Sequence, residues 1–146
     1  MISYQLTEFG QPLERVDTET PIPVGTEVLV RIEACGVCHS DVHLRDGFFD
    51  LGAGKRLDLA KGRTLPLTLG REIAGVVADH GPDATDIEPG ARRVVYPWIG
   101  CGKCDTCHAG DEHLCAQFRA LGVLRDGGFS DHVLVPHPKY LFDFGQ

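Results

Sequence analysis

Hydrophobic and polar residues alternate over several short segments of the chain. The clearest alternation covers residues 26–35, which we predict to form a half-buried strand. Its apolar side consists of Val28, Val30, Ile32 and Ala34, and its polar side of Glu27, Arg31 and Glu33. Comparable patterns predict strands at 71–78, 92–96 and 129–135, and an N-terminal hairpin from 2–9 and 12–18. Short strands separated by Gly- and Pro-containing turns are typical of a mainly β, barrel-like domain.

Three features depart from this simple pattern. In residues 36–43 the apolar residues no longer alternate with polar ones, so we expect a short helix after the long strand. Ser40 or Asp41 would cap this helix. Residues 47–69 contain Gly and Pro without a clear period, and we expect a long irregular surface loop. Gly75 lies inside a predicted strand, which indicates a bulge or a close approach of two backbones.

Length and charge narrow the range of functions. A chain of 146 residues is long enough for one domain with a sizeable core. Its formal net charge of −7 disfavours nucleic acid or a membrane surface as a partner, because both bind clustered Lys and Arg. No apolar run approaches the roughly 18 residues that span a bilayer, and the N-terminus does not resemble a signal peptide. We therefore expect a cytoplasmic protein whose six cysteines are thiols or metal ligands.

Four cysteines follow the spacing C-x2-C-x2-C-x7-C inside the segment 98–120. They are Cys101, Cys104, Cys107 and Cys115. Four thiolates can surround one zinc ion in a tetrahedron, with Zn–S distances of about 2.3 Å, and they leave no open coordination position. Such a loop has too few apolar residues to order itself, and a bound zinc would supply the missing free energy. The spacing therefore predicts one structural zinc.

Other interpretations of these cysteines fit less well. A ferredoxin-type cluster motif closes with a three-residue gap and a proline, whereas the last gap here has seven residues and Ala116 follows it. A thioredoxin-like redox pair needs a βαβ setting, which the strand pattern does not predict. Four free core cysteines in so short a window would be unusual. His108 and His113 lie beside the cysteines and could compete with them as ligands.

A second group of chemically active residues occupies the predicted corner between strand and helix. It contains Cys38, His39, Ser40, Asp41 and His43. Taken alone, this group could form a metal site, a thiol nucleophile site or an ordinary polar surface. A strand end would hold these side chains rigidly while the corner leaves them accessible.

The order of three motifs resembles the zinc-dependent medium-chain alcohol dehydrogenases. The motifs are residues 36–43 (GVCHSDVH), residues 69–75 (LGREIAG) and the four-cysteine segment, and together the resemblance covers essentially the whole chain, 1–146. It implies a GroES-like catalytic domain with a partly open β-barrel, short helices and a zinc-binding lobe at 98–120. In this family a Rossmann domain that binds NAD or NADP normally follows, and we find no G-x-G-x-x-G motif of such a domain here.

The resemblance also implies roles for single residues. Cys38 would be a ligand of a catalytic zinc, and Ser40 would hydrogen-bond the substrate alcohol. His43 would end a proton relay, and His39 would approach the pyrophosphate of the cofactor. Asp41 and Glu72 would lie around the metal. Cys35 has no such role, and we expect it to be a small buried residue.

Arg71 departs from the family pattern. The family has Gly-His-Glu where this chain has Gly70-Arg71-Glu72, and the histidine is a zinc ligand. Arginine is cationic and has donors but no acceptor, so it cannot bind zinc. The family's third ligand would lie beyond residue 146, so Cys38 is the one usual ligand of a catalytic zinc that this chain keeps. We expect the Arg71 guanidinium to pair instead with Asp41 or Glu72. Alternatively, Cys38 and Glu72 could hold zinc together with ligands from the rest of the enzyme.

The sequence therefore predicts the catalytic-domain fragment of a zinc-type NAD(P)-linked alcohol dehydrogenase. The fragment would be inactive by itself, and the whole enzyme would interconvert a small alcohol with an aldehyde or ketone. Oligomerisation is possible in the full-length enzyme. Two alternatives stay open. One is the same domain from a related reductase that lacks catalytic zinc, with Arg71 polarising a carbonyl. The other is a non-enzymatic binding module stabilised by zinc.

Overall fold

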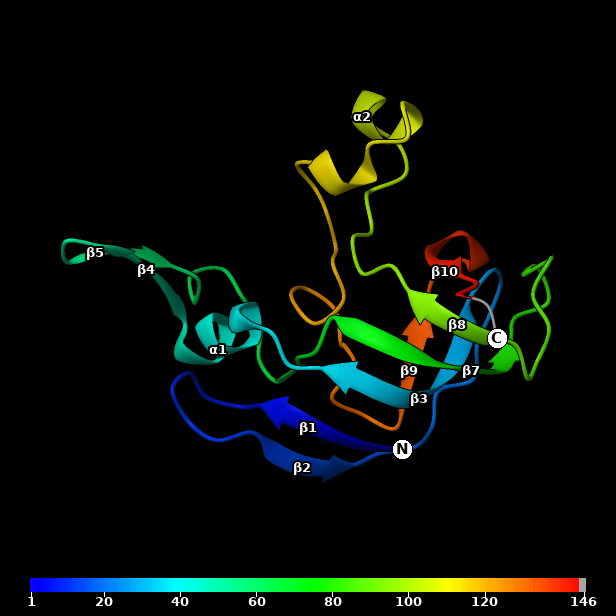
Figure 1. Ribbon diagram of the computed structural model, residues 1–146, viewed down its shortest axis with the longest axis horizontal. Coiled ribbons are helices and arrows are strands. Elements are labelled where there is room, and N and C mark those ends of the chain that lie inside the picture. The colour runs from blue at the N-terminus through cyan, green and yellow to red at the C-terminus, as the bar shows by residue number, and fades with distance from the viewer. Residues whose placement is uncertain (145–146) are drawn as a thin grey trace.

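The computed structural model describes residues 1–144 and is built mainly from short β-strands (Figure 1). Three sheets form, with strand orders β2-β1-β6, β10-β8-β7-β3-β9 and β4-β5. The strands are β1 (Ile2–Leu6), β2 (Glu14–Asp17), β3 (Val28–Gly36), β4 (Phe48–Gly52), β5 (Lys55–Asp58), β6 (Leu67–Thr68), β7 (Glu72–His80), β8 (Arg92–Val95), β9 (His132–Val135) and β10 (Leu141–Phe142). The helices are α1 (His39–Asp46) and α2 (Asp105–His108), with 3-10 turns η1 (Glu112–Leu114) and η2 (Pro138–Tyr140). The predicted mainly β fold is confirmed.

The five-stranded sheet is the centre of the fold. Its long strands β3 and β7 pair antiparallel over most of their length, and β9 pairs with the other edge of β3. The inward-facing residues of these strands build the main core, which includes Val28, Val30, Ile73, Val77, Val133 and Val135. Alternation within each strand places these branched side chains on one buried face. The predicted strands at 71–78, 92–96 and 129–135 are confirmed as β7, β8 and β9.

A bulge changes the faces of β3. The pairing of β3 with β7 shifts register between Ile32 and Ala34, and Ala34 is exposed rather than buried. The prediction that Ala34 continues the apolar face was therefore wrong, because one extra residue in a strand reverses the faces of those that follow. Gly75, opposite Ile32, confirms the predicted close approach: a Cβ there would lie 2.2 Å from the carbonyl oxygen of Arg31.

The N-terminal hairpin packs on a second, smaller core. β1 pairs antiparallel with β2, as predicted, and also with β6. The buried residues of this core are Leu6, Leu44, Leu67, Leu69, Ala120 and Val123. This core connects α1 with the segment before β7. The motifs at residues 36–43 and 69–75 are therefore supported by the same apolar residues.

The segment 47–69 corrects another expectation. We predicted an irregular loop, but residues 48–58 form the antiparallel hairpin β4–β5, which extends away from the sheets (left in Figure 1). Both strands are largely exposed. A strand without a buried face has no alternating pattern, and this explains why the sequence did not reveal it. Within residues 1–144, no helix has both the length and the apolar composition needed to cross a membrane.

Candidate functional site

The cysteine segment forms a lobe that stands away from the main sheet (top of Figure 1). Its backbone turns through α2 and η1 and reverses at Gly102 and Gly110, which have φ angles of 73° and 90°. Glycine adopts these left-handed conformations without steric cost. The chain can therefore wrap tightly enough to bring four distant cysteines to one point.

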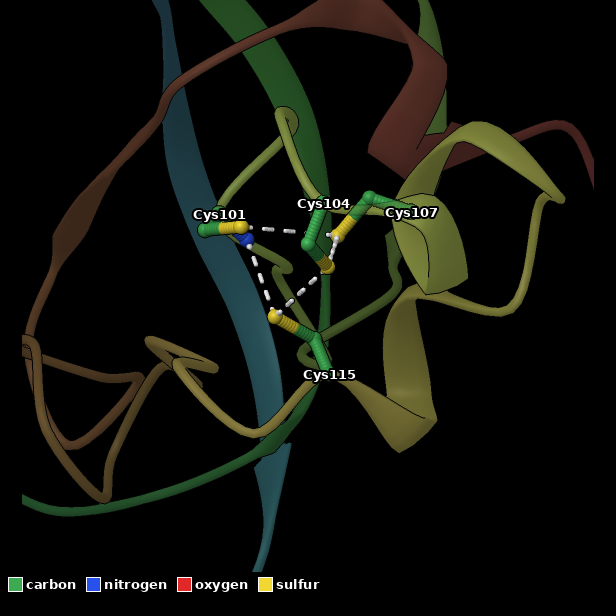
Figure 2. Close-up of side chains that lie close together, drawn as sticks. All are labelled: Cys101, Cys104, Cys107 and Cys115. Carbon is green, nitrogen blue, oxygen red and sulfur yellow. Dashed lines mark hydrogen bonds between the residues drawn. The ribbon is translucent and has the colours of Figure 1, made fainter.

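The four sulfur atoms meet in the centre of the lobe (Figure 2). All four lie within 4.8 Å of one another. Neighbouring Sγ atoms are 3.5 Å apart for Cys104 and Cys107, 3.8 Å for Cys104 and Cys115, and 3.9 Å for Cys101 and Cys107. A zinc tetrahedron with Zn–S distances of about 2.3 Å has edges of about 3.8 Å. The donor set and its spacing therefore fit one structural zinc, and neither His108 nor His113 belongs to the group.

Backbone groups around the lobe favour negative charge on sulfur. The amides of Cys101 and Gln117 donate to Cys115 Sγ at 3.4 and 3.3 Å. A hydrogen bond from the amide of Lys103 is the main cause that lowers the pKa of Cys101 to about 6. Burial raises the pKa of Cys107 to about 11, so the metal would have to displace that proton on binding.

Glu112 attaches the lobe to the end of the main sheet. Its carboxylate accepts hydrogen bonds from the Gly100 amide at 3.0 Å, the Tyr140 hydroxyl at 2.5 Å and the Lys139 ammonium group. Burial acts to raise the pKa of Glu112, but the bonds from Lys139, Tyr140 and Gly100 outweigh it and lower the pKa to about 2. The sequence contained no signal for this contact, because its partners lie 12 to 28 residues apart.

The corner at Cys38 is held by a buried carboxylate. α1 begins after Cys38, and Asp41, with 3% of its surface exposed, accepts a hydrogen bond from the Cys38 amide at 2.9 Å. The predicted helix is confirmed. Asp41 caps it from its third position rather than preceding it, and Ser40 lies inside the helix.

The same carboxylate holds the segment that carries Arg71. The second oxygen of Asp41 accepts a hydrogen bond from the Gly70 amide at 3.1 Å. Gly70 has a φ of 93°, and a Cβ there would lie 2.7 Å from Phe129 and 2.8 Å from Cys35 Sγ. One buried side chain thus fixes the positions of both motifs. Burial is also the main cause that raises the pKa of Cys35 to about 11, and the Asp41 charge acts in the same direction.

Arg71 contacts Cys38. Its Nη2 donates to Cys38 Sγ at 3.2 Å, and its guanidinium carbon lies 5.8 Å from the centre of the Trp98 ring. The expected pairing with Asp41 or Glu72 was wrong, since no ion pair within residues 1–144 joins Arg71 to a carboxylate. Both oxygens of Asp41 are occupied by backbone amides, and the Glu72 side chain is turned towards Gly36.

The other predicted site residues lie around this corner. α1 places His39 and His43 one turn apart, with ring centres 4.2 Å from each other, and the His43 ring also lies 4.4 Å from that of Phe49. Glu72 pairs with Gly36 across the sheet, and a Cβ on Gly36 would lie 2.2 Å from the Glu72 carboxylate. The roles that we predict for Cys38, Ser40, His43, Glu72 and His39 stay predictions.

Residues 1–144 do not form a second zinc site at this corner by themselves. In the part of the chain that the structure describes, the four lobe cysteines are the one group of three or more Cys, His, Asp or Glu side chains close enough to share an ion. Near Cys38, the position of the family's second ligand holds a cation that donates to the sulfur. A zinc ion there would face a positive charge and would find fewer ligands among residues 1–144 than a zinc site needs.

Comparison with known proteins identifies the family. The alcohol dehydrogenase GroES-like domain matches residues 25–144. An NAD-dependent alcohol dehydrogenase of Sulfurisphaera tokodaii is 45% identical over 97% of this chain, which corresponds to 40% of that protein. Another, from Saccharolobus solfataricus, is 42% identical over the same shares.

Solved structures of alcohol dehydrogenases show the same similarity. A thermostable alcohol dehydrogenase from Pyrobaculum aerophilum, described with bound cobalt and zinc, superimposes with a TM-score of 0.81 at 29% identity, over 98% of this chain and 40% of that one. This chain thus spans about 40% of the length of the relatives that it matches. The match extends across the main sheet, the Cys38 corner and the cysteine lobe, and the chain belongs to the alcohol dehydrogenase GroES-like domain family.

Proposed function

We propose that this chain is the catalytic domain of an NAD(P)-linked alcohol dehydrogenase that interconverts a small alcohol with an aldehyde or ketone. The observation that carries the proposal is the similarity to NAD-dependent alcohol dehydrogenases over 97% of the chain. The relatives are longer, and the nicotinamide cofactor would bind mainly to a part of the protein outside residues 1–146. The chain alone would then be inactive.

The residues of the Cys38 corner would handle the substrate. Ser40 is half-buried on the first turn of α1 and would hydrogen-bond the substrate oxygen. His43, one turn further along the helix, would accept the proton that the alcohol loses, and the exposed His39 would meet the cofactor phosphates. When bound, the nicotinamide would supply the hydride acceptor. Glu72 would add negative charge beside the corner.

The zinc of the cysteine lobe would maintain the structure. Cys101, Cys104, Cys107 and Cys115 would hold it, and four protein sulfurs leave no position for a substrate. Its free energy of binding would order a segment with few buried apolar side chains.

One observation favours a second function. Arg71 lies beside Cys38 and has an unpaired donor within residues 1–144, and a reductase without catalytic zinc could use such a guanidinium to polarise a carbonyl oxygen by hydrogen bonding. A non-enzymatic module stabilised by zinc has no comparable support, since the relatives named above are dehydrogenases. Cytoplasmic location and assembly into oligomers stay predictions.

The test is an assay of the protein encoded by the complete gene. NAD or NADP should be reduced in the presence of small primary or secondary alcohols, as followed by nicotinamide absorbance. Ser40→Ala should lower kcat/KM by about 100-fold or more without changing the zinc content, and Thr85→Ala, at an exposed position, should leave both unchanged. Absence of turnover with either nucleotide, in both directions, would refute the proposal.

A further inference from the structure

We propose that the Cys38 corner is a metal-free binding site for a small carboxylate, in which the Arg71 guanidinium occupies the place of a metal and holds the anion beside the Cys38 sulfur. The site concerns residues that the family resemblance assigns to zinc. The proposal goes beyond the dehydrogenase activity and is tested without measuring turnover.

The first support is the position of the guanidinium. Arg71 Nη2 lies 3.2 Å from Cys38 Sγ, so a hydrogen bond joins the two side chains directly. The Gly70 amide just before Arg71 is tied to Asp41, and Asp41 is tied to the Cys38 amide. These bonds come from buried or half-buried groups. The cation is therefore fixed beside the sulfur by the same framework that would otherwise position a metal site.

The second support is the unused hydrogen-bonding capacity of Arg71. Nε is buried and has no partner, and the bond to Cys38 is the one hydrogen bond found for this side chain within residues 1–144. An unpaired buried donor is unfavourable, and a guanidinium fork matches the two oxygens of a carboxylate. The neighbouring acids do not meet this need, since Asp41 is bound to two amides and Glu72 is turned towards Gly36.

The third support is space for a small ligand. Arg71 lines a groove of about 630 Å³ together with Glu72 and mainly apolar side chains that include Tyr96, Trp98 and Phe142. Cys38 does not line this groove itself, and its sulfur is connected to it by the hydrogen bond from the Arg71 guanidinium. The Trp98 ring lies 5.8 Å from the guanidinium carbon and covers one side of it. A short carboxylate with an apolar tail would find its charge at Arg71 and its tail against these side chains. Neighbouring aromatic rings would also reduce the competition of water for the charge.

Iodoacetate is a suitable probe, because it is itself a small carboxylate with an electrophilic carbon. The Cys38 thiolate would attack that carbon, a C–S bond would form, the C–I bond would break and iodide would leave, after the thiol proton passed to solvent. Iodoacetamide reacts in the same way but carries no charge. The ratio of the two alkylation rates at Cys38 therefore measures how far Arg71 attracts the carboxylate.

The experiment uses the zinc-loaded chain, with adducts mapped to each cysteine by mass spectrometry. We expect about one zinc per chain, protection of the four lobe cysteines, and reaction at Cys38. Arg71→Gln should lower the ratio of the iodoacetate rate to the iodoacetamide rate about threefold to tenfold, by loss of one nearby positive charge. Arg92→Gln, which removes an exposed arginine paired with Glu33, should leave the ratio unchanged.

Two results would overturn the proposal. One is a second zinc per chain that protects Cys38 from both reagents and is lost in Cys38→Ser. The other is an equal ratio in the wild type and in Arg71→Gln, with circular dichroism and zinc content showing that the variant is folded. If Arg71→Gln does not fold, competition by acetate in the wild type decides: acetate must slow the reaction with iodoacetate at Cys38 more than that with iodoacetamide, and equal slowing contradicts a carboxylate site.

Discussion

The buried carboxylate of Asp41 accepts a hydrogen bond from the amide of Gly70, 29 positions further along the chain, at 3.1 Å. Its other oxygen accepts the amide of Cys38 at 2.9 Å. One side chain therefore joins the helix α1 to the segment that enters β7. The relative placement of Cys38 and Arg71 depends on this link.

Replacing Asp41 should destabilise the fold. Asp41→Ala leaves two amides without their acceptor, one of them in a buried hydrogen bond, and we expect the free energy of unfolding to fall by about 2–3 kcal/mol. Urea denaturation measures this change. Asp46→Ala is the matched control, since Asp46 pairs with Arg45 at the surface and should matter by less than about 1 kcal/mol. Equal losses in the two variants would show that the link is unimportant.

Gly70 should tolerate no side chain. Gly70→Ala combines a left-handed φ of 93° with contacts of 2.7–2.9 Å to Phe129 and Cys35, so we expect a loss of about 2–4 kcal/mol in unfolding free energy. Gly54→Ala has a similar φ of 75° but no atom within 4 Å of the new Cβ. It should cost only the backbone strain, about 1–2 kcal/mol. Thermal unfolding of both variants compares the two, and an equal shift would mean that close packing at Gly70 adds nothing.

Acid should loosen the attachment of the cysteine lobe. The pKa of Glu112 is about 2 in the folded protein and 4.5 for the ordinary group, so its contribution to stability is complete above pH 4.5 and is lost as the pH falls towards 2. Glu112→Gln should remove this part of the acid dependence and lower stability at neutral pH by about 1–2 kcal/mol. Unfolding free energies at several pH values test this. Glu88→Gln, at an exposed position, should keep the wild-type acid dependence.

Local patterns predicted much of the fold and the zinc lobe. The alternation in β3, β7, β8 and β9 reflects burial on one face, and the cysteine spacing reflects the ligand requirement of a single ion. The hairpin β4–β5 was missed because neither of its faces is buried. A sequence pattern therefore predicts a feature where its cause, such as burial of one strand face or binding of one ion, acts on residues close together in the chain.

The Cys38 corner depended on contacts between distant segments. The type of residue at position 71 indicated that a metal ligand was missing, but not which atom the arginine would contact. The buried Asp41 was already occupied by the Cys38 and Gly70 amides, and no pattern near Arg71 shows this. The sequence did predict Asp41 as a possible helix cap, and Asp41 does accept the Cys38 amide, from the third helical position.

The zinc content of the purified chain tests the central claim most directly. The four sulfurs of the cysteine lobe can hold one zinc, whereas Arg71 stands beside Cys38. We therefore expect about one zinc per chain, measured by elemental analysis after dialysis. Cys107→Ser should abolish it, and Cys35→Ser should leave it unchanged, because Cys35 lies outside the lobe. A metal-free wild type, or zinc that survives in Cys107→Ser and disappears in Cys38→Ser, would contradict the account.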